Sequence, residues 1–412
     1  MTPRADDGLR GIENVDVKGK TVLMRIDVNT PLDPETGEFL NDFRLRSNVE
    51  PIVSLLDRHC KLVLLAHQGD PGEGYEFTSM RNHAQYLSKL CNKPVKFVAD
   101  IFGDAAVKEI KSLNPGECLM LENVRFYSEE KLDRPFEEHA KNHLVKTLSK
   151  VADIYVNNAF SAVHRNHSSI TGFPLAMLSY AGRLMHEEIE AFSKVINNGE
   201  KPKVLIVGGS KIKPKMKMLE RAAHIFDKIL MGGLVANLFI MASGKNIGDI
   251  NIKILEKKGA LEYVDLAKKI LNENQERIEL PEDLIIKDFQ IMDIGSNTIE
   301  KYKHIISNAR EIIFNGPMGM IENPLYARGT EELAKSITAS EAYKVVCGGH
   351  TPVIFEKLRL SDRIDHISTG GGAALLFIGG YELPAITSLK RGQALISGGE
   401  ANGESQKIAE IS

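Results

Sequence analysis

Residues 22–32 read VLMRIDVNTPL, an apolar run that changes abruptly into charged and amide residues before a proline. The first part is typical of a buried β-strand, whereas Arg25, Asp27 and Asn29 fall where that strand would end. Burying charged groups is costly unless they are paired or meet a ligand. Because ligands of open parallel sheets bind beyond the carboxyl ends of the strands, this segment predicts a polar pocket at a strand end.

Three further apolar runs end in polar residues, at 66–69 (AHQG), 121–125 (LENVR) and 156–167 (VNNAFSAVHRNH). Single histidines are usually ordinary surface groups, but here they accompany several arginines in one half of the chain. Those arginines are Arg25, Arg44, Arg125 and Arg165. Since guanidinium forks bind carboxylate and phosphate groups through paired hydrogen bonds, the first half predicts a site for a small anionic substrate.

Composition excludes several classes of protein. The chain has 412 residues, which suggests two or three domains, and a net charge of -3, which gives no reason to expect nucleic-acid or membrane binding. The four cysteines lack CxxC spacing, which disfavours a zinc site and a disulfide framework and fits a reducing compartment. The start lacks an apolar signal segment, and the longest apolar run, 229–242, is shorter than the roughly 20 residues of a membrane span. We therefore expect a cytoplasmic protein.

Short β-branched or leucine-rich runs alternate with longer amphipathic stretches, first through residues 21–160 and again from residue 203. This alternation predicts two α/β domains, each a mostly parallel sheet flanked by helices. The expected strands are 21–26, 62–66, 118–122, 153–157, 203–207, 227–231, 311–314, 343–347 and 365–367. The expected helices are 43–58, 78–91, 136–150, 297–309 and 327–340.

A charged amphipathic stretch separates the two series, and we expect it to form one helix that ends at an Asn-Asn-Gly stop. The predicted division is therefore 1–178 for the first domain, 179–198 for an interdomain helix and hinge, 199–390 for the second domain and 391–412 for a tail. Two alternatives stay open for the tail: it packs back on the first domain, or it frays.

The second half offers glycine turns where the first half offers side chains. Glycines follow apolar runs at 208–209, 232–233, 348–349 and 370–372, and no Gly-Gly occurs before residue 208. Such turns let a ligand approach the main chain, and the N–H groups at a helix start favour phosphate. A lone pair of glycines is usually a plain turn, and both common nucleotide fingerprints, G-x-x-x-x-G-K-[ST] and G-x-G-x-x-G, are absent. Four such turns together nevertheless favour a polyphosphate site.

Two other segments support that interpretation weakly. Residues 204–215 read VLIVGGSKIKPK, and lysines at a helix start oppose the helix dipole, although a solvated lysine face explains them equally well. Residues 315–319 read NGPMG, which is either an ordinary turn or, with Glu322 accepting ribose hydroxyls, part of a nucleoside site.

Seven motifs, in order and across both halves, resemble those of phosphoglycerate kinase, closest to its archaeal branch. They are RIDVNTPL (25–32), HQG (67–69), ENVRF (122–126), HRNHSS (164–169), GGSK (208–211), NGPMG (315–319) and STGGGA (368–373). The resemblance implies two Rossmann-like domains joined by a hinge, with a cleft between them. It also implies reversible transfer of the acyl phosphate of 1,3-bisphosphoglycerate to ADP, giving 3-phosphoglycerate and ATP in glycolysis and gluconeogenesis.

The resemblance further implies roles for individual residues. The triose substrate would be bound by Arg25, Asp27, Val28, Asn29, Arg44, His67, Gln68, Gly69, Asp70, Arg125, His164 and Arg165. The nucleotide, with Mg²⁺ as cofactor, would be held by Gly209, Lys211, Lys215, Gly233, Asn315, Pro317, Glu322, Gly348, Gly349, His350 and Thr351. The catalytic groups would be Arg44, Lys211, Gly371 and Gly372.

The implied chemistry explains why no catalytic base stands out. In the ATP-consuming direction the acceptor is a carboxylate, which is already ionised at neutral pH, so no proton must be removed. Positioning and charge neutralisation suffice for a direct in-line transfer, with hinge bending to bring the reactants together and exclude water.

Four positions depart from the family pattern. They are Asp70 in place of an arginine, Asn158 in place of an aspartate, Pro214 before Lys215, and His350 in place of an aspartate that helps to hold magnesium. The metal ligands therefore stay open. Asp70 would repel a substrate phosphate unless a neighbouring cation compensates, for which we consider His67, Arg46 and Arg81.

Two other functions are weighed against the kinase. A non-catalytic protein on the same fold is motivated by Asp70 and His350, but the retained Arg44 and Lys211 oppose it. A nicotinamide-dependent dehydrogenase is opposed by the missing dinucleotide fingerprint. The expected partners are the two substrates, without nucleic acid or membrane, and the chain is expected to be a monomer or a homodimer.

Overall fold

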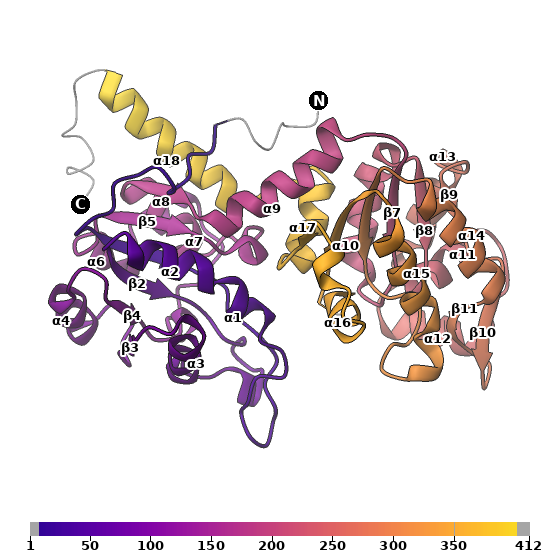
Figure 1. Cartoon of the computed structure of the whole chain (residues 1–412), viewed down its shortest axis with the longest axis horizontal. Helices are drawn as coiled ribbons and strands as arrows, with labels where there is room; N and C mark the ends of the chain where they lie inside the picture. The colour runs from indigo at the N-terminus through magenta and orange to yellow at the C-terminus, as the bar shows by residue number, and fades with distance from the viewer. Residues whose placement is uncertain (1–7, 350, 402–412) are drawn as a thin grey trace. The chain divides into compact units, whose positions relative to one another are not determined.

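The computed structural model describes residues 8–349 and 351–401, which form two compact units (Figure 1). We call residues 8–187 with 382–401 the first unit, and residues 188–381 the second unit. Each unit contains a six-stranded sheet in which all neighbouring strands are parallel. The predicted fold class, two α/β domains, is confirmed.

The sheet of the first unit has the strand order β3-β4-β2-β1-β5-β6. Its strands are β1 Thr21–Arg25, β2 Lys61–Leu65, β3 Val95–Phe97, β4 Cys118–Met120, β5 Ile154–Asn157 and β6 Ser179–Ala181. Its helices are α1 Phe43–Ser47, α2 Val49–Asp57, α3 Arg81–Cys91, α4 Asp104–Ser112, α5 Phe136–Ala140, α6 His143–Leu148, α7 Ser168–Thr171, α8 Phe173–Ala176 and α18 Pro384–Ala401. β1 contains the apolar start of VLMRIDVNTPL, and it pairs with β2 on one side and β5 on the other. It is therefore an inner strand of the sheet and not an edge strand.

Helices cover both faces of this sheet. Val22 and Met24 of β1 pack into one core, which includes residues of α2 and α3. Leu23, between them, packs into a second core on the opposite face. Strands buried on both faces appear as continuous apolar runs instead of alternating ones, which explains the strong strand signal of 21–25. Polar side chains are therefore found at the ends of these strands and not along them.

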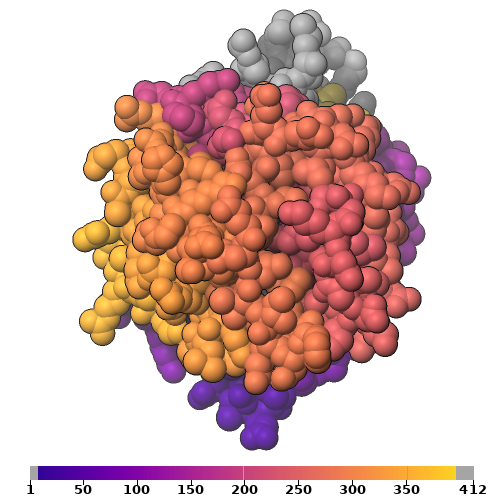
Figure 2. Space-filling view, turned by 90° about the vertical axis from the view of Figure 1, so that its right-hand side faces the viewer, coloured from indigo at the N-terminus to yellow at the C-terminus, as the bar shows by residue number. Residues whose placement is uncertain are grey.

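The sheet of the second unit has the order β14-β13-β12-β7-β8-β9, and a separate antiparallel hairpin, β10-β11, belongs to the same unit. Its strands are β7 Lys203–Val207, β8 Lys228–Met231, β9 Ile278–Glu279, β10 Leu284–Lys287, β11 Gln290–Ile294, β12 Glu311–Asn315, β13 Tyr343–Cys347 and β14 His366–Ile367. Its helices are α10 Ile212–Ala222, α11 Gly233–Ala242, α12 Asp249–Lys257, α13 Val264–Glu273, α14 Ser296–Ser307, α15 Arg328–Ala339, α16 Thr351–Lys357 and α17 Gly371–Ile378. In Figure 2 this unit forms the face turned toward the viewer, in salmon and orange.

Three predicted helices differ from the structure. The helix predicted at 43–58 is divided at Asn48, whose Nδ2 donates hydrogen bonds to the carbonyl oxygens of Asp27 (3.0 Å) and Arg44 (2.8 Å). The helix predicted at 136–150 is likewise two helices, because the Asn142 side chain caps a new start by accepting a hydrogen bond from Val145 N at 2.9 Å. An amide side chain that bonds to the backbone competes with helix continuation, which explains both breaks.

The third difference concerns the predicted 179–198 helix. Residues 179–181 instead form β6, which completes the sheet beside β5. The helix, α9, spans Arg183–Ser193 and continues as a π-helical turn over Lys194–Asn198. Asn158 fixes the start of α9, because its Oδ1 accepts a hydrogen bond from Leu184 N at 3.0 Å.

The last described helix, α18, lies on the first unit, where it contacts α7, α8 and β6. Gln393 ties it to the rest of the unit: Oε1 accepts from Arg10 N at 2.9 Å, and Nε2 donates to Ser179 O at 3.1 Å. The chain returns to the first unit at residue 382, and α18 starts at Pro384. The predicted tail, 391–412, is described only as far as residue 401. Among the helices described, none combines the length and apolar character that a membrane span requires.

Candidate active site

The strand ends of the first unit bring arginines around Asp27. The Oδ2 atom of Asp27, which follows β1, lies 3.2 Å from Nη1 of Arg44 on α1. Arg44 Nη1 also donates to Asn29 O at 2.7 Å. Burial raises the pKa of the Asp27 carboxyl group, but the Arg44 guanidinium and a hydrogen bond from Ser161 outweigh burial and lower it below its usual value. The ionised carboxylate thus orients Arg44, whose side chain keeps 31% of its surface exposed.

Behind Asp27, His67 lies between two guanidinium groups. Arg25 Nη2 is 2.9 Å from His67 Nδ1, and Arg165 Nη1 is 3.2 Å from His67 Nε2. Burial, followed by the charges of Arg25 and Arg165, lowers the pKa of His67 well below its usual value, so the ring is neutral. A neutral imidazole has one acceptor nitrogen, so only one guanidinium can donate to it. The other contact joins two donors, and an anionic oxygen placed beside them would satisfy both.

A second group of contacts continues this surface from the turn after β2. Gly69 N donates to Asn29 Oδ1 at 2.8 Å, and Gly69 O accepts from Arg125 Nη1 at 2.5 Å. Gly69 has φ +65, and a Cβ there would lie 2.5 Å from the Glu76 carbonyl carbon, so this turn requires glycine. We call the group formed by Arg25, Asp27, Asn29, Arg44, His67, Arg125 and Arg165 the arginine cluster.

The cation expected beside Asp70 is not the one that the sequence suggested. Asp70 Oδ2 lies 3.0 Å from Arg125 Nη1, and Oδ1 forms an ion pair with Lys131. Of the three candidates, Arg46 pairs with Asp42, Arg81 lies 4.7 Å above the Phe97 ring centroid, and His67 is neutral. Sequence reasoning missed Lys131, which is 61 positions away from Asp70 and carries no motif.

Three predicted substrate residues have their side chains occupied or enclosed. Gln68 is fully buried and braces the Thr30 backbone, accepting from its N at 3.1 Å and donating to its O at 2.9 Å. Val28 packs into the core. These two residues could meet a ligand through their backbone alone. Burial lowers the pKa of His164, and its buried Nδ1 has no hydrogen-bond partner among the described residues.

Glycine turns of the second unit gather at one edge of its sheet. A Cβ at Gly209 would lie 3.3 Å from both Pro317 Cδ and Lys215 Nζ, and one at Gly316 would lie 3.1 Å from Lys215 Nζ. Gly209, Gly233 and Gly316 have φ values of +72, +56 and +88, which other residues rarely adopt. The turns after β7, β8 and β12 therefore need glycine for conformation as well as for space.

Lys215 projects into these turns from α10. Its residue is 5% exposed, and burial, together with the charge of Lys211, lowers the pKa of Lys215 to about 8. Pro214 occupies the first turn of α10, where it was expected to be tolerated. A buried ammonium group beside backbone turns suits an anionic ligand.

The turn after β13 and the start of α17 lie on the same edge. Gly316 N donates to Thr351 Oγ1 at 2.8 Å, and a Cβ at Gly371 would lie 3.9 Å from Gly348 Cα. Side chains at Gly349 or Gly372 would meet no described atom within 4 Å, so the space before α17 is open. The six residues of this group are Gly209, Gly233, Gly316, Gly348, Gly371 and Lys215, and we call them the glycine cluster.

The remaining predicted nucleotide residues differ in burial. Asn315 is buried and donates from Nδ2 to Cys347 Sγ at 3.2 Å, whereas Lys211 and Glu322 are exposed. His350 lies outside the described residues. Within the described part of the chain, no group of three or more His, Cys, Asp or Glu residues could hold a metal ion.

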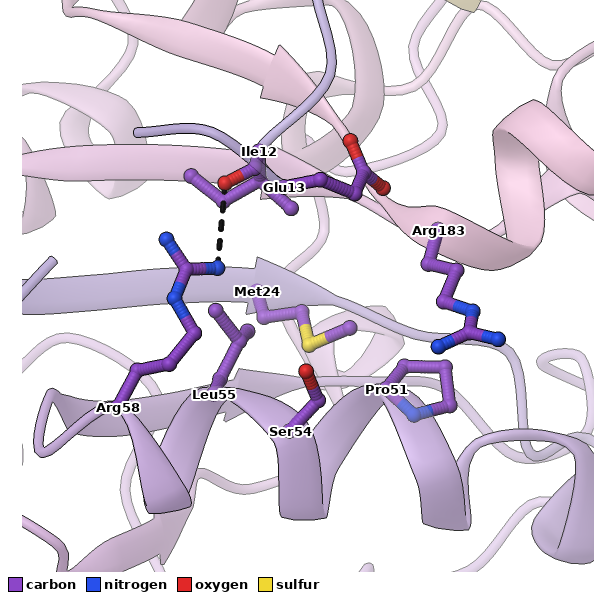
Figure 3. A pocket seen from close by; sticks show the side chains of 8 residues that line it. All are labelled: Ile12, Glu13, Met24, Pro51, Ser54, Leu55, Arg58 and Arg183. Atoms are coloured by element: carbon purple, nitrogen blue, oxygen red, sulfur yellow. Dashed lines mark hydrogen bonds between the residues drawn. The ribbon is translucent and has the colours of Figure 1, made fainter. Parts of the chain in front are cut away.

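A cavity of about 230 Å³ lies elsewhere in the first unit, beside α2, and Met24 points into it (Figure 3). Its two arginines have other partners. Arg58 Nη1 donates to Ile12 O at 3.2 Å, and Arg183 Nε lies 2.8 Å from Glu187 Oε1. None of the arginine cluster lines this cavity, so it is separate from the candidate active site.

Comparison with known proteins identifies the family of the whole chain. A family model described as phosphoglycerate kinase matches residues 12–381. The phosphoglycerate kinase of Methanothermus fervidus is 42% identical over 396 residues, covering 92% of this chain and 96% of the relative. That of Sulfurisphaera tokodaii is 39% identical, covering 97% of this chain and 100% of the relative.

Solved structures agree with these sequence matches. The crystal structure of phosphoglycerate kinase from Pyrococcus horikoshii OT3 has a TM-score of 0.88 at 38% identity, covering 94% of this chain and 100% of that chain. The phosphoglycerate kinase structure from Coxiella burnetii has a TM-score of 0.76 at 30% identity, covering 93% and 99%. Similarity of this extent includes both units.

Proposed function

Because the chain belongs to the phosphoglycerate kinase family, we propose that its arginine cluster binds the phosphoglycerate substrate and its glycine cluster binds ADP or ATP. The chain is a kinase that transfers phosphate between 1,3-bisphosphoglycerate and ADP. The non-catalytic and dehydrogenase alternatives are therefore set aside.

One observation carries the assignment of the triose site: the neutral ring of His67 lies between the guanidinium groups of Arg25 and Arg165 and can accept from only one of them. His67 Nε2 and Arg165 Nη1 are 3.2 Å apart, and an anionic oxygen would accept from both. Arg44 adds a charge that Asp27 orients without fully burying. A substrate that carries a carboxylate or acyl phosphate at one end and a phosphate at the other supplies such oxygens.

The nucleotide site is supported by the backbone turns that meet beside the buried ammonium group of Lys215. The glycine cluster lets phosphate oxygens approach main-chain N–H groups, and Lys215 adds charge at the same place. The start of α17 would stabilise the transferring phosphoryl group through Gly371 and Gly372. Lys211 and Glu322, both exposed, would contact the phosphates and the ribose, respectively.

Magnesium would enter with the nucleotide. Mg²⁺ usually keeps several waters and binds through substrate phosphates with one or two protein oxygens, so it needs no cage of carboxylates. When bound, the ion would neutralise phosphate charge, and we assign no side chain to it.

The chain's own residues would act by positioning. Arg44 and Lys211 would neutralise the oxygens of the phosphoryl group in flight, while the acceptor carboxylate needs no base. In-line transfer requires the reactants within bonding reach, so movement of one unit toward the other stays our prediction. We expect the radius of gyration, measured by small-angle X-ray scattering, to fall when both substrates bind; an unchanged radius would contradict this. A cytoplasmic location and a monomeric or homodimeric state are likewise predictions, the second of which sedimentation analysis would test.

The first test is Mg²⁺-dependent ATP formation from ADP and 1,3-bisphosphoglycerate generated in situ. We expect Arg44→Ala and Lys211→Ala each to lower turnover by orders of magnitude. Lys213→Ala is the matched control for Lys211, because it removes another exposed lysine two positions along the same helix start. If the control loses as much activity as Lys211→Ala, or if Arg44→Ala retains full turnover, the proposed site is wrong.

A further inference from the structure

A buried carboxylate lies behind the arginine cluster, and the chemistry above does not use it. Glu130 is 0% exposed. Its Oε1 accepts a hydrogen bond from Ser169 Oγ at 2.6 Å, and its Oε2 accepts one from Ser169 N at 2.9 Å. Ser169 lies in α7, so the carboxylate clamps both the backbone and the hydroxyl group of one residue of that helix.

The direction of the hydrogen bonds that follow is fixed. The single hydroxyl proton of Ser169 is donated to Glu130, so its Oγ is left to accept from Arg25 Nε at 3.0 Å. Arg25 Nη2 in turn donates to His67 Nδ1 at 2.9 Å. Since a guanidinium group has no acceptor, this donation cannot reverse. Arg165 is also only a donor, but it lies farther from the ring, at 3.2 Å, and Asp27 Oδ1 is 3.8 Å from Nδ1, beyond hydrogen-bond distance. Because Arg25 makes the shorter contact and is anchored by Ser169, we assign the acceptor to Nδ1 and the proton of the neutral His67 ring to Nε2, the nitrogen beside Arg165.

We propose that Glu130 is a positioning residue for the substrate site: through Ser169 and Arg25 it holds His67 as the Nε2–H tautomer. His67 Nε2–H and Arg165 Nη1–H then present two donors to one substrate oxygen. This inference rests on the proposed function, because it gives that arrangement a use. Glu130 itself contacts neither the substrate nor the reacting atoms.

Charge supports the same assignment. Arg25 is 1% exposed, and an uncompensated charge at such a position is costly. Burial lowers the pKa of Arg25, whereas Glu130 and then Asp27 raise it. Asp27 is already paired with Arg44, so Glu130 supplies the opposite charge that Arg25 needs.

The neighbouring serine offers a matched control. Ser168 and Ser169 are both 0% exposed and are consecutive in α7. Ser168 Oγ lies 2.9 Å from His139 Nδ1 and 3.2 Å from Glu129 O, and it makes no contact with Arg25 in the described structure. Ser168→Ala therefore removes an equally buried hydroxyl group from the same helix without interrupting the path from Glu130 to His67.

The experiment is ¹⁵N NMR of the histidine rings of the full chain at pH 8, with His67 assigned by the signal lost in His67→Gln. We expect a pyridine-type Nδ1 and a protonated Nε2 in the wild type and in Ser168→Ala. In Ser169→Ala we expect a mixture of tautomers, because Arg25 loses its fixed acceptor. Glu130→Gln is the second variant: it leaves one acceptor oxygen in place of the two that receive the hydroxyl group and the backbone N–H of Ser169, so we expect the same change. A wild-type pattern in both variants would overturn the proposal.

Kinetics then separate this inference from the proposed site. We expect Ser169→Ala to raise the KM for 3-phosphoglycerate by about tenfold with kcat changed by less than about threefold, and Ser168→Ala to change neither beyond about twofold. A tautomer change without a change in KM would overturn the link to the substrate, and the fault would then lie in the proposed site. An unchanged tautomer with a raised KM would overturn the positioning role while leaving that site intact.

Discussion

The two units present their candidate ligand sites in opposite ways. In the first unit, charged side chains such as Arg25 and Asp27 are buried and are held by other polar side chains: Asp27 pairs with Arg44, and Arg25 contacts Ser169 and His67. In the second unit, glycine turns bring the backbone itself to the ligand, and Lys215 is the one buried charged side chain of the glycine cluster. Side chains provide specific recognition but must be kept charged in a core, whereas backbone turns provide close approach but tolerate no added atom. Substitutions should therefore impair the two sites in different ways: the first through the stability of its buried charges, the second through the space around its backbone turns.

The largest expected effect concerns the stability cost of the side-chain site. Burial raises the pKa of Glu130 from 4.5 to about 7. The folded state then binds more protons than the unfolded state between these values, so the free energy of unfolding falls as pH rises from about 4.5 to about 7 and is flat above. We expect the stability of the wild type relative to Glu130→Gln to decline across this window by up to about 3 kcal/mol.

Denaturant unfolding at pH 5, 6, 7 and 8, followed by circular dichroism, measures this difference. The charged and titratable groups that face Glu130 are Arg25, Tyr155 and His167, whose Nδ1 lies 3.9 Å from Glu130 Oε1. Burial lowers the pKa of His167 to about 3, so it stays neutral throughout the window, and all three groups remain in the variant. A difference that stays flat from pH 5 to pH 8 would show that Glu130 is ionised in the fold throughout this range, and it would contradict the raised pKa.

The second effect tests the backbone site. A Cβ on Gly316 would lie 2.7 Å from the carbonyl carbon of Gly208, and this glycine has φ +88. We expect Gly316→Ala to weaken ADP binding at least about a hundredfold, because the turn must move away from Lys215. Isothermal titration with ADP and, separately, with 3-phosphoglycerate measures both sites.

Gly244→Ala is the control for Gly316→Ala. Gly244 has nearly the same φ, +87, but nothing lies within 4 Å of an added Cβ. Its substitution therefore carries the backbone strain without the collision. Equal loss of ADP binding in the two variants would mean that strain, and not close approach, makes the glycine necessary. Loss of 3-phosphoglycerate binding in Gly316→Ala would contradict the separation of the two sites.

The sequence predicts those parts of the two sites that lie within one continuous segment, and it does not predict contacts between distant positions. β1 and the glycine turns are continuous segments, so VLMRIDVNTPL and the Gly-Gly pairs indicate them directly. β3, β6 and β9 have two or three residues each, too few to show periodicity, and all three were missed. The hairpin strands β10 and β11, of four and five residues, were missed as well. Glu130 belongs to an acidic pair that is typical of a surface, and its contact with Ser169 spans 39 positions, so only the fold reveals it.

The third effect is a pH dependence of the backbone site. Because the pKa of Lys215 is lowered to about 8, its ammonium loses a proton as pH rises above that value, and its attraction for phosphate is lost with it. We expect the affinity for ADP to fall about tenfold between pH 7 and pH 9 in the wild type. Arginine stays protonated at both values, so Lys215→Arg should flatten the profile; calorimetric titration at each pH is the measurement. Burial lowers the pKa of Lys215 most; of the neighbouring groups, Cys347 raises it and Lys211 lowers it. A wild-type affinity that does not change between pH 7 and pH 9 would contradict the buried position of this ammonium group.

The smallest effect concerns Asp70, where the side-chain site contains an anion of its own. Its carboxylate forms ion pairs with Arg125 and Lys131, so a substrate phosphate must compete with it for both cations. Asp70 is 33% exposed, which weakens the interaction through solvent screening. We therefore expect Asp70→Asn to lower the KM for 3-phosphoglycerate about threefold, Asp70→Arg to lower it further, and Lys131→Met to raise it about threefold, with kcat nearly constant.

Lys141→Met, which removes a lysine ten positions along the chain that has no described pair with Asp70, is the control, and salt above physiological strength should reduce all these differences. An unchanged or raised KM in Asp70→Arg would mean that Asp70 serves mainly to hold Lys131 and Arg125 in place, and the first unit would then use carboxylates in one way throughout, as it uses Asp27 to orient Arg44.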